Sequence, residues 1–190
     1  VYLPPKYDSS KKSYPVLYIH DGQNVFDKAT SYSGEWEVDE TLNKLHQTHG
    51  LDVIVVSIDN SEKRMQEYTA WEHEKYDAPK GKEYIDFIAK TLKPAIDQKY
   101  RTKKEAKNTA IMGSSMGGLI SHYAAFQYPN VFGKAGIFSP SFWFSDEIIS
   151  FTKWRLAKAK NSKIYYLMGE KEGGNMVIDM QKIIHTIKTN

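Results

Sequence analysis

Apolar runs of strand length alternate with segments of helical period along this chain. The predicted strands are residues 14–20, 51–58, 109–113, 135–138 and 162–168. The predicted helices are residues 36–46, 84–100, 116–128, 146–158 and 176–188, and Pro94 is expected to kink or restart the second of them. This alternation is typical of βαβ units. The sequence therefore predicts an α/β fold with a mostly parallel sheet.

Length and composition fit one globular domain. Of the 190 residues, 41% are hydrophobic and 26% are charged, and the net charge of +3 is spread along the chain. A nucleic-acid binder would concentrate its basic residues, and a membrane helix would need an apolar run of about 20 residues. The chain has no cysteine, which excludes disulfides and a cysteine nucleophile. We expect a soluble domain with no nucleic-acid or membrane partner, and the compartment and oligomeric state stay open.

The segment Gly113-Ser114-Ser115-Met116-Gly117 has the G-x-S-x-G pattern of a serine nucleophile. A bare match of this kind can be a simple glycine-rich turn, but here it joins a predicted strand to a predicted helix. A dinucleotide fingerprint would need glycine at Ser115, and a P-loop would need Gly-Lys-Ser/Thr. The sequence therefore predicts an α/β-hydrolase fold, a three-layer sandwich, with Ser115 as nucleophile and the Met116 amide as half of an oxyanion hole.

The turn after the first predicted strand is the candidate for the second oxyanion donor. It reads His20-Asp21-Gly22-Gln23-Asn24, and an α/β hydrolase supplies this donor from a backbone N–H at the same place. We predict that Gly22 and Gln23 provide it, with Gly22 letting the chain pass close to substrate. His20 precedes the nucleophile, whereas the fold orders its triad as nucleophile, acid and base. Support of the turn is therefore the expected role of His20.

Two carboxylates follow the last predicted strand, where the fold carries its triad acid. They are Glu170 and Glu172, and the flexible Gly173-Gly174 comes directly after them. We choose Glu172 as the acid that would orient the base and stabilise its imidazolium form. A solvated run of charges explains both residues nearly as well, so the choice between Glu170 and Glu172 stays open.

No histidine in the chain is a good candidate for the base. His185 follows Glu172 but lies inside the last predicted helix, and His122 lies two turns into the helix that Ser115 opens. We expect a fragment, in which residues 1–190 form a single α/β-hydrolase domain that lacks its last strand and the loop with the catalytic histidine. That histidine is expected beyond Asn190.

Two loops are candidates for contact with substrate. Phe142 and Trp143 follow a strand on the same edge as Ser115, so their rings can wall an acyl or aryl pocket, although core packing explains them equally well. The long loop of residues 59–76 offers four side chains that can recognise a polar substrate, Arg64, Glu67, Tyr68 and Trp71, and Tyr68 is the contact that we choose. A solvated loop is the alternative for that segment.

With these residues in view, the chain resembles the putative esterase family of α/β hydrolases, which includes enterochelin, feruloyl and acetyl-xylan esterases and S-formylglutathione hydrolase. The resemblance rests on residues 16–27, 111–143 and 165–173. It implies Ser115 as nucleophile, Met116 and the turn at residues 21–23 as oxyanion hole, Glu172 as acid and a histidine near the family's C-terminal end. The family acid is often Asp, so Glu172 is a departure. The loop at residues 76–81 is also shorter than the family pattern implies.

The predicted function is hydrolysis of a small-molecule or carbohydrate-linked ester through an acyl-enzyme on Ser115, with no metal or organic cofactor. Acyl transfer to an alcohol is the alternative within enzymes. A binding module on a hydrolase scaffold is the alternative from another class, and the missing base favours it.

Overall fold

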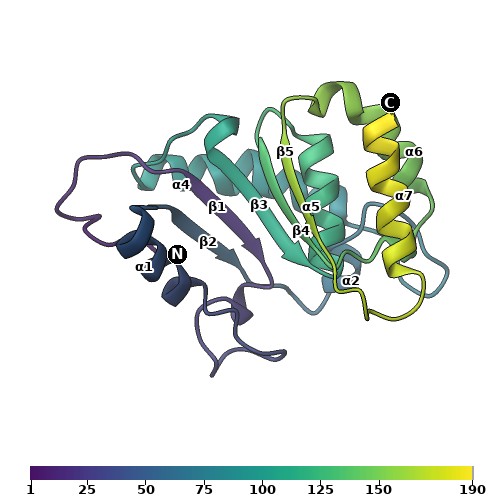
Figure 1. The fold of residues 1–190 in the computed structure, drawn as a ribbon, viewed down its shortest axis with the longest axis horizontal. Coiled ribbons are helices and arrows are strands. Elements are labelled where there is room, and N and C mark those ends of the chain that lie inside the picture. Colours follow the sequence, from purple (N-terminus) through teal and green to yellow (C-terminus); the bar gives the residue numbers. More distant parts are fainter. Residues whose placement is uncertain (190) are drawn as a thin grey trace.

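A parallel sheet forms the centre of the molecule. The structure, a computed structural model, describes residues 1–189. The sheet has five strands in the order β2-β1-β3-β4-β5, and each neighbouring pair is parallel (Figure 1). This arrangement confirms the predicted α/β fold. The strands are β1 Val16–His20, β2 Ile54–Ile58, β3 Thr109–Ser114, β4 Lys134–Phe138 and β5 Lys163–Leu167.

Helices connect the strands as the sequence predicts, and the ends of the predicted elements are displaced by no more than three residues. The short α2 is the exception, because its four residues were expected to be loop. None of the helices in the described part of the chain is long and apolar enough to cross a membrane. The helices are α1 Val38–His49, α2 Arg64–Glu67, α3 Gly81–Phe87, α4 Lys93–Lys99, α5 Met116–Gln127, α6 Glu147–Ala159 and α7 Met176–Thr189.

Pro94 explains the irregular middle of the helical segment that was predicted over residues 84–100. Here α3 passes into a π-helical turn, Ile88–Leu92, and α4 resumes with Pro94 in its first turn. Proline has no N–H to donate to the preceding turn, and a π turn shifts the bonding pattern around the missing donor. The predicted restart is confirmed, and its form is a π turn.

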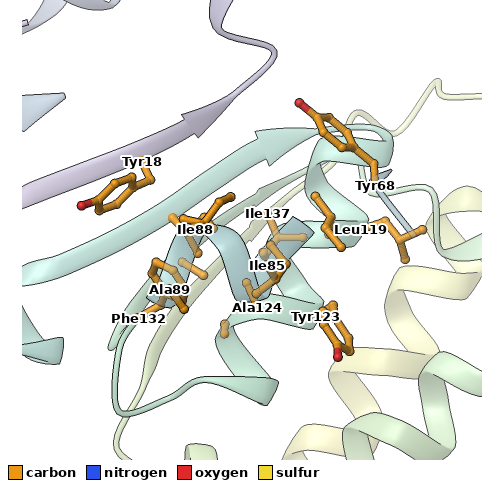
Figure 2. Packing of buried hydrophobic residues seen from close by; sticks show 14 of the residues in the cluster. Tyr18, Tyr68, Ile85, Ile88, Ala89, Leu119, Tyr123, Ala124, Phe132 and Ile137 are labelled. Carbon is orange, nitrogen blue, oxygen red and sulfur yellow. The ribbon is translucent and has the colours of Figure 1, made fainter. Parts of the chain in front are cut away.

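Two apolar cores, one on each face of the sheet, give the molecule three layers. The larger core joins the sheet to α3, α4, α5, α6 and α7. Figure 2 shows part of it, where Tyr18 of β1 and Ile137 of β4 share one buried cluster with Ile85 of α3 and Leu119 of α5. The smaller core contains Leu42 of α1 together with Ile19 of β1 and Val55 of β2. Figure 1 shows α1 beside these two strands. The predicted three-layer sandwich is therefore confirmed.

Because all five strands are parallel, their carboxyl ends meet at one edge of the sheet (Figure 1). Sheets of this kind bind ligands beyond that edge. The segments that follow β1, β3, β4 and β5 all begin there, and they include the predicted nucleophile and acid. The topology thus brings the predicted site residues to one side of the molecule.

His122 ties α5 to its neighbours as a neutral imidazole. Its Nε2 lies 2.8 Å from Thr152 Oγ1, and that hydroxyl donates its own hydrogen to the Ile148 carbonyl at 2.6 Å. Thr152 must therefore accept from His122 Nε2–H, which leaves Nδ1 to accept from the Tyr166 hydroxyl at 2.9 Å. Burial lowers the pKa of His122 to about 3. Protonating this ring would place an uncompensated cation in the core.

Two buried histidines predict that mild acid destabilises the fold. Burial is the main cause that lowers the pKa of His20 to about 4 and that of His122 to about 3, from 6.5 in the unfolded chain. The unfolded state therefore binds more protons below pH 6.5. Above pH 6.5 each neutral histidine contributes fully to the free energy of unfolding. As the pH falls below 6.5, that free energy decreases by about 1.4 kcal/mol per pH unit for each histidine, until the pH reaches the pKa of the ring in the folded protein.

We expect His122→Phe to reduce by roughly half the slope of the unfolding free energy against pH between about pH 6 and 5, measured by urea denaturation. Tyr166→Phe is the matched control, because it removes the partner hydroxyl but keeps the titrating ring, and its slope should equal that of the unaltered protein. An unchanged slope in His122→Phe would contradict the assignment.

Candidate active site

Ser115 occupies a strained turn between β3 and α5. Its backbone has φ 58° and ψ −122°, a region that residues other than glycine rarely adopt, and its side chain is exposed. The Ser115 N–H donates to the Phe138 carbonyl at 3.0 Å, so the turn is fixed to the end of β4. This geometry holds the hydroxyl out from the carboxyl edge of the sheet.

The glycine two residues before Ser115 is required by a close approach of backbone to backbone. A Cβ on Gly113 would lie 2.7 Å from the carbonyl carbon and oxygen of Gly117. No ordinary Cβ contact is that short, so a side chain at residue 113 would push β3 and α5 apart. The G-x-S-x-G pattern therefore has a direct structural cause here.

Ser141 is a neighbour of Ser115, the predicted nucleophile, and the sequence analysis did not identify this neighbour. Its Oγ lies 3.2 Å from Ser115 Oγ, and its N–H donates to the Ser115 carbonyl at 3.1 Å. Ser141 is only 2% exposed. The two bonds restrain both the backbone and the hydroxyl of Ser115. The only sequence signal was its place in the segment that follows β4.

The two predicted sources of oxyanion donors lie next to each other. Met116 begins α5, and the first bond of this helix runs from Leu119 N to Ser115 O at 3.0 Å, so the earlier N–H groups precede the intrahelical ladder. A Cβ on Gly117 would lie 3.4 Å from His20 Cβ. His20, the last residue of β1, therefore packs against the first turn of α5, and the oxyanion hole itself stays a prediction.

The sequence analysis expected Gly22 to let the chain pass close to substrate, but the structure shows a close approach to the end of β2. A Cβ at residue 22 would lie 2.7 Å from the Ile58 backbone and 2.5 Å from Asp59 Oδ1. The close approach is thus to the end of β2, which is a property of the fold. Asn60 holds Gln23, because Gln23 Nε2 donates to Asn60 Oδ1 and Asn60 N donates to Gln23 Oε1 at 3.3 Å.

The structure places Tyr68 beneath this turn, where it cannot contact a substrate. Tyr68 is 0% exposed, and its hydroxyl accepts from Asp21 N at 3.0 Å. Its position contradicts the expectation that the ring faces a ligand, because helix α2 turns the ring inward, where it packs against Tyr84 and His20.

His20 has the supporting role that was expected. Its Nδ1 lies 2.9 Å from the Tyr84 hydroxyl, and the ring is 2% exposed. Among the described residues no polar group pairs with its Nε2. Burial, with a smaller contribution from the charge of Arg64, lowers the pKa of His20 to about 4, although the charge of Asp21 opposes the shift. A neutral ring in this place stabilises the turn.

Glu172 turns toward the end of β4. Its Oε1 accepts from Gly169 N at 2.8 Å and also from the Ser139 hydroxyl. Ser139 has a positive φ of 41° and precedes Ser141 by two residues. Glu172 thus lies beside the segment that contacts Ser115, without contacting Ser115 itself. Glu170 is exposed.

The two predicted aromatic contacts have opposite surroundings. Phe142 is 4% exposed and packs edge-on against His122 at 5.1 Å between ring centroids, which places it in the core. Trp143 is 46% exposed, and the centroid of its ring lies 6.4 Å from that of His73. Core packing therefore explains Phe142, and Trp143 is available to a ligand.

In residues 1–189 no histidine nitrogen makes a hydrogen bond with Ser115. His46 pairs with Asp52 at 2.6 Å, and His49 pairs with Thr48 at 2.7 Å. His185 lies on the exposed side of α7. The base is thus not supplied by the described residues in this arrangement. A possible cation cluster, Glu35, Asp39 and Glu40, lies at the start of α1 and includes none of the predicted site residues.

A serine raised on a strained turn between a central strand and a buried helix, with a donor turn beside it, is the site architecture of an α/β hydrolase. The chain matches the family described as "Putative esterase" over residues 1–187, and it belongs to this family.

Two curated relatives share about a quarter or more of their aligned residues with this chain. The uncharacterized protein YbbA of Bacillus subtilis is 28% identical over 181 residues, which cover 91% of this chain and 68% of YbbA. The siderophore enterobactin esterase of Emericella nidulans is 27% identical over 165 residues, covering 75% of this chain and 51% of that protein. The chain thus spans about two thirds of one relative and half of the other.

Solved structures support the fold. The BES protein from Bacillus cereus superposes with a TM-score of 0.76 at 19% identity, covering 98% of this chain and 74% of that one. A ferulic acid esterase superposes with a TM-score of 0.69 at 16% identity, covering 98% of this chain and 77% of that one. The expected relation to siderophore and ferulic acid esterases is confirmed at the level of family and fold.

The contact at Gly113 predicts a large effect of one added methyl group. Gly113→Ala should lower the free energy of unfolding by about 1–3 kcal/mol, because the clash is with backbone that cannot rotate away. Gly173→Ala is the matched control, since a Cβ there meets nothing within 4 Å, and its unfolding free energy should change by less than about 0.5 kcal/mol. Urea denaturation measures both. Equal stability of the two variants would contradict the close approach.

Proposed function

We propose that this protein is a serine-dependent carboxylic ester hydrolase that acts through an acyl-enzyme on Ser115. The observation that carries the proposal is the strained, exposed Ser115 at the start of α5, with φ 58°. Strain of this kind persists only where the surroundings enforce it, and it is concentrated at functional sites. Here the bond from Ser115 N to Phe138 O and the two bonds to Ser141 enforce it.

In the first step, the Ser115 oxygen attacks the ester carbonyl carbon while its proton passes to a base. The carbonyl oxygen becomes an oxyanion, which the Met116 N–H and a backbone N–H from Gly22 or Gln23 stabilise. Each such donor contributes about 3 kcal/mol to lowering the barrier. The alcohol then leaves with a proton from the base, and water cleaves the acyl-enzyme by the reverse sequence.

Glu172 is proposed to orient the base. One of its oxygens is already occupied by Gly169 N and the Ser139 hydroxyl, which fixes the plane of the carboxylate and leaves the other oxygen for an imidazole N–H. The expected base, a histidine beyond Asn190, remains a prediction. Because the described histidines do not reach Ser115, activity is to be measured on the complete natural protein.

The proposed substrate is a small-molecule or carbohydrate-linked ester. Two similar proteins carry the names siderophore enterobactin esterase and ferulic acid esterase, and both names refer to esters. Trp143 is proposed to contact the aryl or acyl group of the ester, because its ring is exposed and the segment that follows β4 carries it. Acyl transfer would share every step up to the acyl-enzyme, so product analysis with added glycerol separates the two reactions.

Ser115→Ala should reduce the hydrolysis of p-nitrophenyl acetate by at least about 1,000-fold while leaving the fold intact, because the hydroxyl is exposed and its one described hydrogen bond is to Ser141 Oγ at 3.2 Å. Release of p-nitrophenol measures the rate, and the unaltered protein should show a burst equal to one acyl group per active site. A protein that cleaves no ester with Ser115 in place would favour the binding-module alternative.

The acid assignment predicts a contrast between neighbouring carboxylates. Glu172→Gln should lower kcat for p-nitrophenyl acetate by about 100-fold or more, because an amide no longer stabilises the imidazolium. Glu170→Gln, a matched change two residues earlier on the exposed side of the loop, should leave kcat within about 2-fold of the unaltered protein. The reverse contrast would assign the acid to Glu170.

A further inference from the structure

A buried carboxylate lies beside the proposed oxyanion donors. Asp21 follows β1 directly, and its left-handed backbone, φ 57° and ψ 48°, opens the donor turn. A Cβ on Gly117, in the first turn of α5, would lie 3.3 Å from Asp21 Oδ2. The Asp21 side chain is only 12% exposed, so water screens its charge weakly. An unpaired charge on Asp21 would therefore oppose the formation of the oxyanion, a second negative charge, at the start of α5.

Arg64 neutralises this carboxylate from α2. Its Nε donates to Asp21 Oδ1 at 2.6 Å and its Nη2 donates to Oδ2 at 2.8 Å. A fork of this kind fixes the plane of the carboxylate as well as its charge. The Arg64 side chain is 22% exposed, and Tyr32 adds a longer bond to Asp21 Oδ1 at 3.4 Å. Asp59, the other carboxylate near Gly22, is exposed and therefore better screened.

The ion pair is also connected to the backbone of the turn. The guanidinium carbon of Arg64 lies 5.0 Å from the centre of the Tyr68 ring, and the Tyr68 hydroxyl accepts from Asp21 N. Tyr68 N in turn donates to the Arg64 carbonyl at 2.9 Å. Asp21 is therefore restrained at its carboxylate by Arg64 and at its N–H by Tyr68. The residue that follows it is Gly22, the proposed donor.

We propose that Arg64 is a positioning residue for ester hydrolysis: it neutralises Asp21 and fixes the turn, so that the oxyanion forms beside a neutral ion pair. The inference rests on the proposed hydrolase function. The described hydrogen bonds of the Arg64 side chain, from Nε and Nη2, both go to Asp21 and none goes to Ser115. Its effect on the reaction thus passes through Asp21.

The test is a double-mutant cycle on the complete protein with p-nitrophenyl acetate, an uncharged ester that an arginine cannot attract by charge. Arg64→Met should lower kcat by about 10–100-fold with KM within about 3-fold, because the unpaired carboxylate opposes the transition state alone. Asp21→Asn should lower kcat by less than about 5-fold, since it removes the charge that Arg64 balances. Adding Asp21→Asn to Arg64→Met should recover most of the lost kcat.

A matched control and a conservative variant accompany the cycle. Lys93→Met breaks a comparably buried pair with Asp97 on α4, whose side chains are 10% and 13% exposed, and should leave kcat unchanged. Arg64→Lys keeps the charge but loses the fork, and should retain more kcat than Arg64→Met. If Arg64→Met does not fold, Arg64→Lys and Asp21→Asn still decide the question. The charge of Asp21 is balanced in the first variant and removed in the second, so the proposal expects both to keep most of their kcat. A large loss of kcat in both variants would contradict it.

Four outcomes overturn the proposal. A raised KM with unchanged kcat in Arg64→Met would mean that Arg64 contacts substrate. Equal losses of kcat in Arg64→Met and Asp21→Asn, with no recovery in the double variant, would mean that the pair is purely structural. The free energy of unfolding would then fall in parallel with kcat. Full activity of Arg64→Met in an active protein removes this inference alone, whereas an unaltered protein that cleaves no ester removes the proposed function and this inference together.

Discussion

The site depends on one backbone constraint, the positive φ of Ser115 where β3 turns into α5. Three contacts enforce it from outside the turn: Ser115 N bonds to the last residue of β4, Ser141 bonds to the Ser115 carbonyl, and Gly113 allows α5 to approach β3. A strained conformation of this kind costs about 1–3 kcal/mol, which the surrounding packing must offset. The helix α5, with every residue from Met116 to Phe126 buried, provides that packing.

The order of the strands explains why the other site segments come together. β1 lies between β2 and β3, so the turn after β1 meets both the loop after β2 and the first turn of α5. This is how Asp21 reaches Arg64, which is 43 residues away in the chain. On the other side, β4 lies between β3 and β5, so its last residues reach Ser115 in one direction and Glu172 in the other. The segment of residues 138–141 therefore connects Ser115, the proposed nucleophile, to the proposed acid.

Local patterns in the sequence were sufficient for the fold and for the turn that holds Ser115. Apolar periodicity reports burial over a few residues, which is why strand β3 and helix α5 were predicted within one residue of their ends, and the glycine spacing around Ser115 reports a turn. Contacts between loops leave no such pattern. The pairing of Asp21 with Arg64, the contact of Ser141 with Ser115 and the inward turn of Tyr68 all depend on strand order and on the short α2, neither of which periodicity predicts. Tyr68 was consequently expected at the ligand and lies in the core.

The nucleophilic character of Ser115 can be measured directly by reaction of the complete protein with a fluorophosphonate, followed by mass spectrometry of its peptides. A hydroxyl held at a strained turn and facing ready N–H donors should take one phosphonyl group per molecule, on Ser115 and on no other serine, with Ser141 unmodified. The loss of this adduct in Gly113→Ala, which disturbs the turn but keeps the hydroxyl, would support the role of backbone geometry. Absence of the adduct from the unaltered, folded protein, or its appearance on a different serine, would contradict the account.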